Sequence, residues 1–244
     1  MIDIHNHILP GVDDGSQTWE TTLAMCKLAL ADGITHIVAT PHANHRYTYN
    51  REQHAESLLE LAAKFPAIQF SLGCDFNLSH ENIQDAIAHP DRYTISDTHW
   101  LLVEFNDFQT PDQMTDSLFR LHSASFNTIV THPERNPIII QYPDLPQQFY
   151  DMGAALQITA SSLCGDWGRK AKKICETLLK KGLVSFIASD AHDPKRRTPV
   201  LSEARQIAAK IVGDAEAQIL VQENPCTVVS NQPLMEEAST SYSR

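Results

Sequence analysis

Residues 184–192 read Val-Ser-Phe-Ile-Ala-Ser-Asp-Ala-His, an apolar run that ends in an acid and an imidazole. A short run without polar alternation is typical of a strand that is covered on both faces, as in a parallel sheet between helices. We therefore predict a strand over residues 184–189, with Asp190 and His192 just beyond its end. This pairing of a buried strand with polar residues at its carboxyl end recurs along the chain.

Similar runs and the helical stretches between them complete the pattern. The predicted strands cover residues 2–5, 36–40, 68–76, 100–105, 128–131, 155–159 and 184–189. The predicted helices cover residues 16–31, 51–65, 111–123, 168–181 and 201–212, the first with Ser16 as its N-cap and Gly33 as its stop. Strand and helix alternate about seven times, which favours one parallel-stranded α/β domain, with closure into a barrel as the leading geometry.

The length and composition of the chain agree with a single domain. Its 244 residues are 42% hydrophobic, enough for a full-sized core, and they contain neither an internal repeat nor a Gly/Ser linker. We expect one domain over residues 1–230 and a flexible C-terminal tail over residues 231–244, where the sequence is polar.

Charge and cysteine usage restrict the partners and the compartment. The formal net charge of −11 disfavours nucleic-acid binding, because proteins that bind phosphate backbones are normally basic. An acidic protein that handles phosphate needs a local positive charge, and bound metal is the obvious source. Five cysteines without a C-x-x-C pair indicate a reducing compartment. The polar N-terminus does not resemble a signal peptide and no run approaches ~18 apolar residues, so we expect a cytoplasmic protein without a membrane span.

Six of the seven predicted strands carry a histidine or a carboxylate at their carboxyl end. These residues are His5, His7, His42, Asp75, Glu104, His132, Asp190 and His192. In a parallel barrel these ends converge on one mouth, where such folds place their chemistry. Imidazole nitrogens and carboxylate oxygens together form the ligand set of Zn, Mn or Fe. Because alternate strand residues point to the same side, His5 and His7 can reach one ion.

Simpler interpretations apply to isolated residues. A single histidine at a strand end is usually a hydrogen-bonded surface residue, and we interpret most of the other histidines in this way: His36, His54, His80, His89, His99 and His122. His45 is a slightly better candidate for ligation. Asp13 and Asp14 precede Gly15 and could simply form a turn.

Other catalytic chemistries lack their motifs. The anion-binding loop of a cysteine phosphatase requires an arginine six positions after the cysteine, and the nearest case, Cys164 with Arg169, is one residue short. No phosphate-binding G-x-x-x-x-G-K-[ST] loop is present, no G-x-G-x-x-G follows the first strand, and no G-x-S-x-G elbow occurs. A metal centre built from the strand ends is therefore the leading hypothesis.

Four motifs follow one another along the chain: Asp3-Ile4-His5-Asn6-His7, Thr40-Pro41-His42, Thr131-His132-Pro133-Glu134-Arg135-Asn136 and Ser189-Asp190-Ala191-His192. In this order and spacing they resemble the PHP superfamily (polymerase and histidinol phosphatase). The stretches His5-Asn6-His7-Ile8-Leu9-Pro10 and Asp13-Asp14-Gly15 are similar, more closely, to the bacterial capsule and exopolysaccharide tyrosine phosphatases of that superfamily. The resemblance extends from residue 1 to about residue 200.

The resemblance implies a distorted seven-stranded (β/α) barrel that holds two or three divalent ions, usually manganese, with iron or zinc as alternatives. It assigns the ligands of the ions as His5, His7 and Asp190; Glu104 and His132; and His42, His192 and Asp14, with Asp13 as the alternative to Asp14. The residue that bridges two ions is normally the glutamate of a Gly-x-Glu motif, whereas this chain has Asp75 at that position. Aspartate is one methylene shorter, so we expect a monodentate bridge or one weaker metal site.

The resemblance also implies a function, namely metal-dependent hydrolysis of protein phosphotyrosine in the control of capsular or exopolysaccharide synthesis. The expected partner is a phosphotyrosine-bearing protein, such as the Tyr-rich tail of a bacterial tyrosine kinase. Arg135 is expected to neutralise the phosphate oxygens, unless it only pairs with Glu134 or a helix carboxylate. Arg196 or Arg197 is a candidate second clamp, and His42 or His192 a candidate proton donor to the leaving group.

Two other functions stay open from the sequence. One is a phosphatase for a small ester such as histidinol phosphate. The other is a weakly active module that binds and regulates a kinase, for which the departure at Asp75 is the argument. A proofreading nuclease is disfavoured by the net charge of −11.

Overall fold

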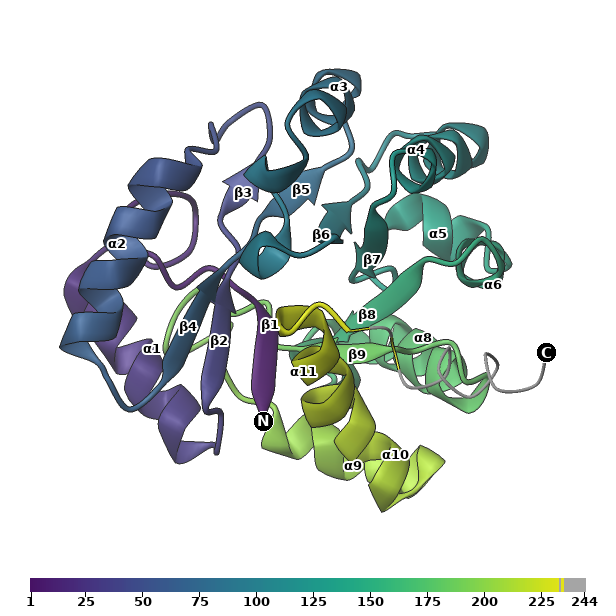
Figure 1. The fold of residues 1–244 in the computed structure, drawn as a ribbon. Coiled ribbons are helices and arrows are strands. Elements are labelled where there is room, and N and C mark those ends of the chain that lie inside the picture. The colour runs from purple at the N-terminus through teal and green to yellow at the C-terminus, as the bar shows by residue number, and fades with distance from the viewer. Residues whose placement is uncertain (233, 235–244) are drawn as a thin grey trace.

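The computed structural model describes residues 1–232 and 234. Most of the tail predicted from residue 231 therefore lies outside the described residues. Within them the chain forms two parallel sheets surrounded by helices (Figure 1).

The two sheets have three and six strands in the described part of the chain. The smaller sheet has the order β1 (Ile2–Asn6), β2 (His36–Ala39) and β4 (Gln69–Leu72). The larger has the order β3 (His42–Ala43), β5 (Asp75–Asn77), β6 (Trp100–Glu104), β7 (Asn127–Thr131), β8 (Ala155–Thr159) and β9 (Phe186–Ala188). Every pairing is parallel, as the continuous apolar runs predict.

Two of the seven predicted strands are interrupted, so the described residues contain nine. The segment predicted over residues 36–40 continues past Pro41 as β3, and that predicted over residues 68–76 is split at Gly73 into β4 and β5. Pro41 has no amide hydrogen for the ladder. A Cβ at Gly73 would lie 2.9 Å from Ile95 Cγ1, so a glycine is required at this bend. His42 and Asp75 consequently begin short strands of the larger sheet instead of ending the predicted ones.

The two sheets meet where the first and last strands lie side by side (Figure 1). Asn6 forms a parallel bridge with Ala191, and the His7 amide donates to the Ala191 carbonyl at 2.9 Å. The Asp190 amide donates to the His5 carbonyl at 2.8 Å. These backbone bonds bring the histidines of the N-terminal motif next to the C-terminal Asp190.

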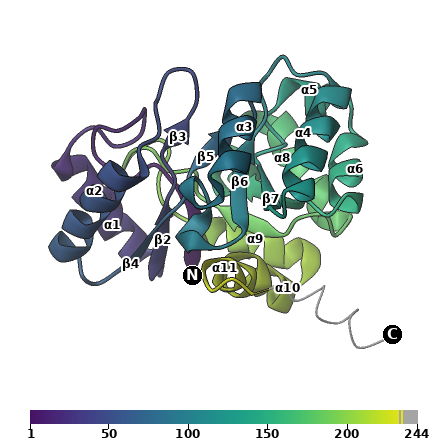
Figure 2. The same ribbon diagram turned by 45° about the horizontal axis from the view of Figure 1, so that its top comes forward.

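The helices cover the outer faces of the sheets. They are α1 (Trp19–Ala31), α2 (Arg51–Lys64), α3 (His80–Ala88), α4 (Pro111–Ser123), α5 (Pro137–Gln141), α6 (Leu145–Asp151), α7 (Ala160–Cys164), α8 (Gly168–Lys180), α9 (Ser202–Val212), α10 (Asp214–Gln218), a π-helical turn η3 (Ile219–Glu223) and α11 (Asn224–Val229). Short 3₁₀ turns η1 (Pro90–Arg92) and η2 (Ile95–Asp97) precede β6. In Figure 2, α1 and α2 lie on the opposite side of the molecule from α4, α5 and α6.

The five predicted helices are present, with one wrong boundary. The first begins at Trp19 with Thr18 as its N-cap, which accepts a bond from the Thr21 amide. Ser16, the predicted cap, instead shares a 2.7 Å hydrogen bond with the hydroxyl of Thr22. The chain turns between residues 11 and 18 and cannot be helical there, because the Ser16 amide donates back to the His7 carbonyl.

Two apolar clusters hold the strands in place. The inner cluster includes Ile4, Leu102, Ile129 and Phe186, which are fully buried, and Val228 of α11 packs against the same cluster. The outer cluster joins the strands to the helices. Burying each large aliphatic side chain stabilises the fold by roughly 1.5–3 kcal/mol, so this core positions the strand ends firmly. No helix among the described residues is both long enough and apolar enough for a membrane crossing.

Candidate metal centre

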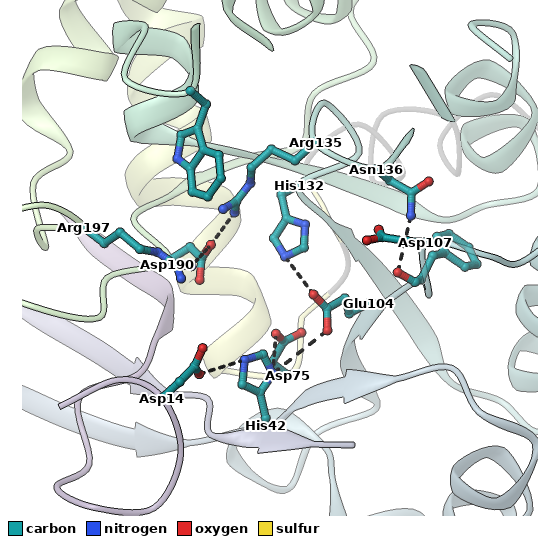
Figure 3. Close-up of a pocket in the computed structure, with 12 residues that line it drawn as sticks. Asp14, His42, Asp75, Glu104, Asp107, His132, Arg135, Asn136, Asp190 and Arg197 are labelled. Atoms are coloured by element: carbon teal, nitrogen blue, oxygen red, sulfur yellow. Dashed lines mark hydrogen bonds and ion pairs between the residues drawn. The ribbon is translucent and has the colours of Figure 1, made fainter. Parts of the chain in front are cut away.

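The carboxyl ends of the strands surround a cavity of about 320 Å³ (Figure 3). Its lining includes strand residues of the larger sheet and residues of the loops that follow strands of both sheets: Asp14, His42, Asp75, Glu104, His132, Arg135, Trp167, Asp190 and Arg197. His5 and His7 lie beneath this lining and are almost fully buried. All nine residues predicted as ligands therefore lie within one region of the molecule.

His5 and His7 direct the same ring atom toward each other. His5 Nδ1 lies 2.8 Å from Gln157 Oε1, and His7 Nδ1 lies 2.7 Å from Asp13 Oδ2. Amide and carboxylate oxygens can only accept, so each Nδ1 carries the proton and each neutral ring leaves a lone pair on Nε2. The two Nε2 atoms are 3.2 Å apart. When both rings are neutral, the two lone pairs are directed into this gap, where one cation could bind both nitrogens.

Asp75 lies between three of the histidines. Its Oδ2 is 3.1 Å from His42 Nδ1, 3.6 Å from His5 Nε2 and 4.0 Å from His7 Nε2. The side chain is buried, yet neither carboxylate oxygen has a hydrogen-bond partner. Burial alone would raise its pKa, but His5 and His42 hold the pKa of Asp75 well below its usual range. A buried carboxylate without hydrogen bonds is costly unless a cation binds it.

The structure distinguishes the two acids of the turn after β1. Asp13 Oδ2 also accepts a bond from the His42 amide at 3.1 Å, so Asp13 supports two histidines from behind. Asp14 instead faces the cavity, with its Oδ1 3.3 Å from His42 Nε2 and 3.5 Å from His192 Nε2. Asp14 therefore has the geometry of a ligand, and Asp13 that of an orienting residue behind a ligand.

Glu104 and His132 form the opposite wall, with Glu104 Oε1 3.6 Å from His132 Nε2 (Figure 3). Burial and the neighbouring Asp75 carboxylate raise the pKa of Glu104 to about 8. His132 has φ of 32° and Asp190 has φ of 52°, a region that residues other than glycine rarely adopt. Such strain of about 1–3 kcal/mol per residue persists where it positions functional side chains.

The donor set fits divalent metal ions. Four groups of side chains place ligand atoms within 4.8 Å of one another: His7, Asp14, His42 and His192; His5, His7 and Asp75; His5, His132 and Asp190; and His42, Asp75 and Glu104. Among the described residues, the buried polar atoms without a partner include both Asp75 oxygens, His42 Nδ1 and His192 Nε2. Nitrogen and oxygen donors in overlapping groups suit several adjacent ions of the Mn, Fe or Zn kind.

Asp190 connects this cluster to two arginines. Its Oδ1 lies 3.3 Å from His5 Nε2, whereas its Oδ2 accepts hydrogen bonds from Arg135 and, at 2.6 Å, from Arg197. Burial alone would raise its pKa, but Arg135 and His5 hold the pKa of Asp190 well below its usual range. Figure 3 shows both guanidinium groups converging on Asp190 at the cavity edge. Arg196, the alternative to Arg197, is exposed and does not line the cavity.

Trp167, Gln157 and Thr159 were not identified from the sequence. The Arg135 guanidinium lies over the Trp167 ring at 4.4 Å from its centroid, and Trp167 Nε1 donates to Ser161 Oγ at 3.1 Å. Thr159 Oγ1 accepts a bond from Arg135 at 2.8 Å. Gln157 and Thr159 belong to β8, the one predicted strand without a histidine or acid, and their polar character in a buried run was the available signal.

The other histidines and the cysteines lie apart from the metal cluster. His36 Nε2 is 2.8 Å from Ser71 Oγ, and His122 Nε2 is 2.8 Å from Thr128 Oγ1. His45 lines a second depression that adjoins the cavity at Asp14 and His42. All five cysteines are free thiols, and none lines the cavity. Burial raises the pKa of Cys26 to about 12 and that of Cys164 to about 11, which suppresses the thiolate.

Comparison with known proteins places this geometry in a family. Residues 1–230 match the family model of capsular polysaccharide synthesis proteins, CpsB/CapC. The chain is similar to a putative tyrosine-protein phosphatase CapC of Staphylococcus aureus, with 35% identity over 208 residues, or 83% of this chain and 81% of the relative. It is 31% identical over 242 residues to the tyrosine-protein phosphatase YwqE of Bacillus subtilis, covering 97% of this chain and 94% of the relative.

Solved structures agree with this match. The chain resembles one from the crystal structures of YwqE from Bacillus subtilis and CpsB from Streptococcus pneumoniae, described as metal-dependent tyrosine phosphatases, with a TM-score of 0.90, 30% identity and 96% of both chains covered. A histidinol phosphate phosphatase from Lactococcus lactis shares the fold alone, with a TM-score of 0.59, 14% identity and coverage of 90% of this chain and 94% of that one. The family match and the two sequence relatives agree over most of the chain, which therefore belongs to the CpsB/CapC family of capsular polysaccharide synthesis proteins.

Proposed function

We propose that this protein is a metal-dependent phosphatase that removes phosphate from protein phosphotyrosine in the control of capsular or exopolysaccharide synthesis. One observation carries the chemistry: the Nε2 atoms of His5 and His7 converge beside a buried Asp75 carboxylate that has no hydrogen-bond partner. The names of the relatives support the substrate class, since CapC, YwqE and CpsB are all called tyrosine-protein phosphatases.

Nine residues are proposed to hold two or three divalent ions, with Mn²⁺ as the expected metal: His5, His7, Asp14, His42, Asp75, Glu104, His132, Asp190 and His192. When bound, such ions activate a water molecule and offset the charge of the phosphoryl oxygens. Asp13 and Gln157 keep His7 and His5 in the tautomer that ligates, because each accepts the Nδ1 proton.

Arg135 and Arg197 are proposed to bind the phosphate. Both line the cavity and both already bind a carboxylate oxygen of Asp190, so their guanidinium groups are oriented before substrate arrives. A guanidinium fork suits the oxygens of a phosphate. Arg135 does approach Glu134, at 3.9 Å, but its stronger contacts are with Thr159 and with Asp190, which lines the cavity.

Trp167 is suited to the aromatic leaving group. Its ring lines the cavity, 45% of the residue is exposed, and Arg135 fixes its orientation. Aromatic rings at such a site stack with roughly 0.5–1.5 kcal/mol beyond simple burial. A phenol has a pKa near 10, so its departure is assisted by a proton. His42 and His192 are the donors expected from the sequence, and each can serve only while the donating nitrogen is not bound to metal.

The fold proposed for this function is a single catalytic domain over residues 1–230, arranged as a distorted seven-stranded barrel. Counting β2 with β3 and β4 with β5 as bent strands gives seven, and the Asn6–Ala191 bridge joins the first to the last. A cytoplasmic location is proposed from the free thiols. The proposed partner is a phosphotyrosine-bearing protein, with the Tyr-rich tail of a tyrosine kinase as the expected form.

Substrate turnover separates this proposal from its rivals. With Mn²⁺, we expect hydrolysis of a phosphotyrosyl peptide well above that of histidinol phosphate. Chelation should abolish turnover and Mn²⁺ should restore it, whereas iodoacetamide should have little effect because no cysteine lines the cavity. Preference for histidinol phosphate would favour the alternative function, a phosphatase for small phosphate esters. Failure to hydrolyse even p-nitrophenyl phosphate with metal present would favour the regulatory module.

A further inference from the structure

A second cavity, of about 260 Å³, lies among helices α5, α6 and α8. Asn136, the N-cap of α5, and Trp167, the residue before α8, both line the catalytic cavity. One turn further along the two helices, Ile139 and Lys170 line the second cavity. Helices α5, α6 and α8 lie on the same side of the molecule in Figures 1 and 2. The second cavity is therefore a groove that lies one helical turn beyond the catalytic cavity along both helices.

The floor of this groove is apolar. It is formed by side chains of α5, α6 and α8 and the turn between α5 and α6: Ile139, Ile140, Pro143, Pro146, Ile174 and Leu178. Its concave form matters, because a depression can receive a protruding side chain but cannot insert its own side chains into a lipid bilayer. A polypeptide with an apolar side chain fits such a floor better than a membrane surface does.

The rim of the groove is basic. Lys170, Lys173 and Lys181 line it and are exposed, and no aspartate or glutamate is part of the lining. Among the described residues, no ion pair joins any of these three lysines to a carboxylate. The whole chain has 30 acidic residues against 19 lysines and arginines, so a groove lined only by cations among its charged residues is a local reversal of the overall charge.

We infer that this lysine-rimmed groove docks an acidic segment of the substrate polypeptide, one that presents an apolar side chain between its carboxylates. The inference rests on the proposed phosphatase function and adds a recognition site outside the metal centre. Helix α8 has 13 residues and is about 20 Å long, and an extended chain advances ~3.3 Å per residue. A docked segment of about six residues next to the phosphotyrosine would span the groove while the phosphate reaches Arg135.

The test compares two phosphotyrosyl peptides, one flanked by Glu and Leu residues and one flanked by Ser and Ala, on the metal-loaded enzyme. The triple variant Lys170→Glu, Lys173→Glu and Lys181→Glu should raise KM for the acidic peptide about tenfold and leave KM for the neutral peptide within about twofold, since exposed charge pairs contribute modestly. Its turnover of p-nitrophenyl phosphate should not change. High salt should reduce the wild-type preference for the acidic peptide.

A matched control makes the same change in net charge elsewhere. Lys27→Glu, Lys180→Glu and Lys210→Glu alter three exposed lysines outside the groove lining and should leave the ratio of the two KM values unchanged. Thr177→Trp should fill the groove without removing a charge, and it should lower the preference for the acidic peptide as well.

Several outcomes would overturn the inference. An unchanged KM ratio in the groove triple variant, with normal p-nitrophenyl phosphate turnover, would refute the docking site but not the proposed phosphatase function. An equal loss in the control variant assigns the effect to net charge. If the groove triple variant loses binding to phosphatidylglycerol vesicles while its KM ratio is unchanged, the three lysines bind a lipid surface instead of a peptide. Absence of any phosphotyrosyl turnover in the wild-type enzyme, by contrast, refutes the proposed function itself.

Discussion

Strand β1 contributes to two buried polar clusters that differ in how their hydrogen bonds are completed. The Asp3 carboxylate accepts bonds from the Ser189 amide at 2.9 Å, the Ser189 hydroxyl at 2.5 Å and Asn6 Nδ2 at 2.9 Å. The Asp75 carboxylate, equally buried, has no hydrogen bond to either oxygen and instead lies 3.1–4.0 Å from three imidazole nitrogens. Both carboxylates give up the same hydration, so the difference lies in what replaces the water.

This difference separates a structural cluster from a functional one. Both oxygens of the Asp3 carboxylate are hydrogen-bonded within the protein, and these bonds fasten β1 to the segment after β9. In the cluster around Asp75, the imidazole nitrogens and carboxylate oxygens are directed toward one another, which is the arrangement expected of a site that binds metal. Two equally buried acids, Asp3 on β1 and Asp75 on β5, can thus be assigned by their remaining hydrogen-bonding capacity, where burial alone does not distinguish them.

The largest expected effect follows from removing an acid of the functional cluster. Asp190→Ala should lower the rate on p-nitrophenyl phosphate by at least ~10²-fold, because it removes a proposed ligand and also the carboxylate that orients Arg135 and Arg197. His7→Ala and His132→Ala should fall in the same range. Steady-state kinetics at saturating Mn²⁺ provide the measurement.

Histidines outside the cluster serve as controls for these variants. His89→Ala and His122→Ala should retain near wild-type rates, since their rings contact Asp85 and Thr128 away from the cavity. Wild-type turnover in Asp190→Ala would refute the assignment of this cluster as the catalytic centre.

An intermediate effect is expected for the acid behind the cluster. Asp13→Asn places an amide where His7 Nδ1 and the His42 amide both donate, so the two imidazoles lose their common support. Replacing an orienting residue of this kind usually costs about 10–100-fold in metal affinity. Activity titrated against Mn²⁺ should therefore shift to higher concentration and recover at saturation. A loss that no Mn²⁺ concentration restores would assign Asp13 a direct catalytic role.

The smallest effect on rate is expected in the structural cluster. Asp3→Asn leaves one of the three donors without its acceptor and should lower the free energy of unfolding by about 1–3 kcal/mol. Urea unfolding measures this change, and kcat at saturating Mn²⁺ should stay within about threefold of wild type. A rate loss comparable to that of Asp190→Ala would remove the distinction between the two clusters.

The sequence predicted those functional residues whose role follows from their place at the end of a strand. The apolar runs placed β1, β6, β7, β8 and β9 within a few residues, and each polar strand end contributed to the cluster of proposed ligands. The different roles of Asp13 and Asp14 could not be predicted from the sequence. Asp13 contacts His7 and Asp14 contacts His42 because of the shape of the turn, which the bond from the Ser16 amide to the His7 carbonyl closes.

Features that depend on distant partners were also missed. The bends at Pro41 and Gly73 arise because two strands pass together from one sheet to the other, and Gly73 is required only by the approach of Ile95. The ring of Trp167 is positioned at the cavity by the guanidinium group of Arg135, which lies 32 positions earlier in the chain. Such contacts are set by tertiary packing and leave no periodic signal.

The metal-to-protein ratio of Asp75 variants tests the central claim most directly. An alternative in which Asp75 only caps the turn near Asn77 and Ser79 is wrong, because neither oxygen of its carboxylate accepts a hydrogen bond. If Asp75 bridges two ions, Asp75→Asn removes the negative charge that offsets their repulsion, whereas Asp75→Glu retains it. Elemental analysis should find about two or more ions per chain in wild type and Asp75→Glu, and a loss of both metal and p-nitrophenyl phosphate turnover in Asp75→Asn. A fully metallated and active Asp75→Asn protein would contradict the account.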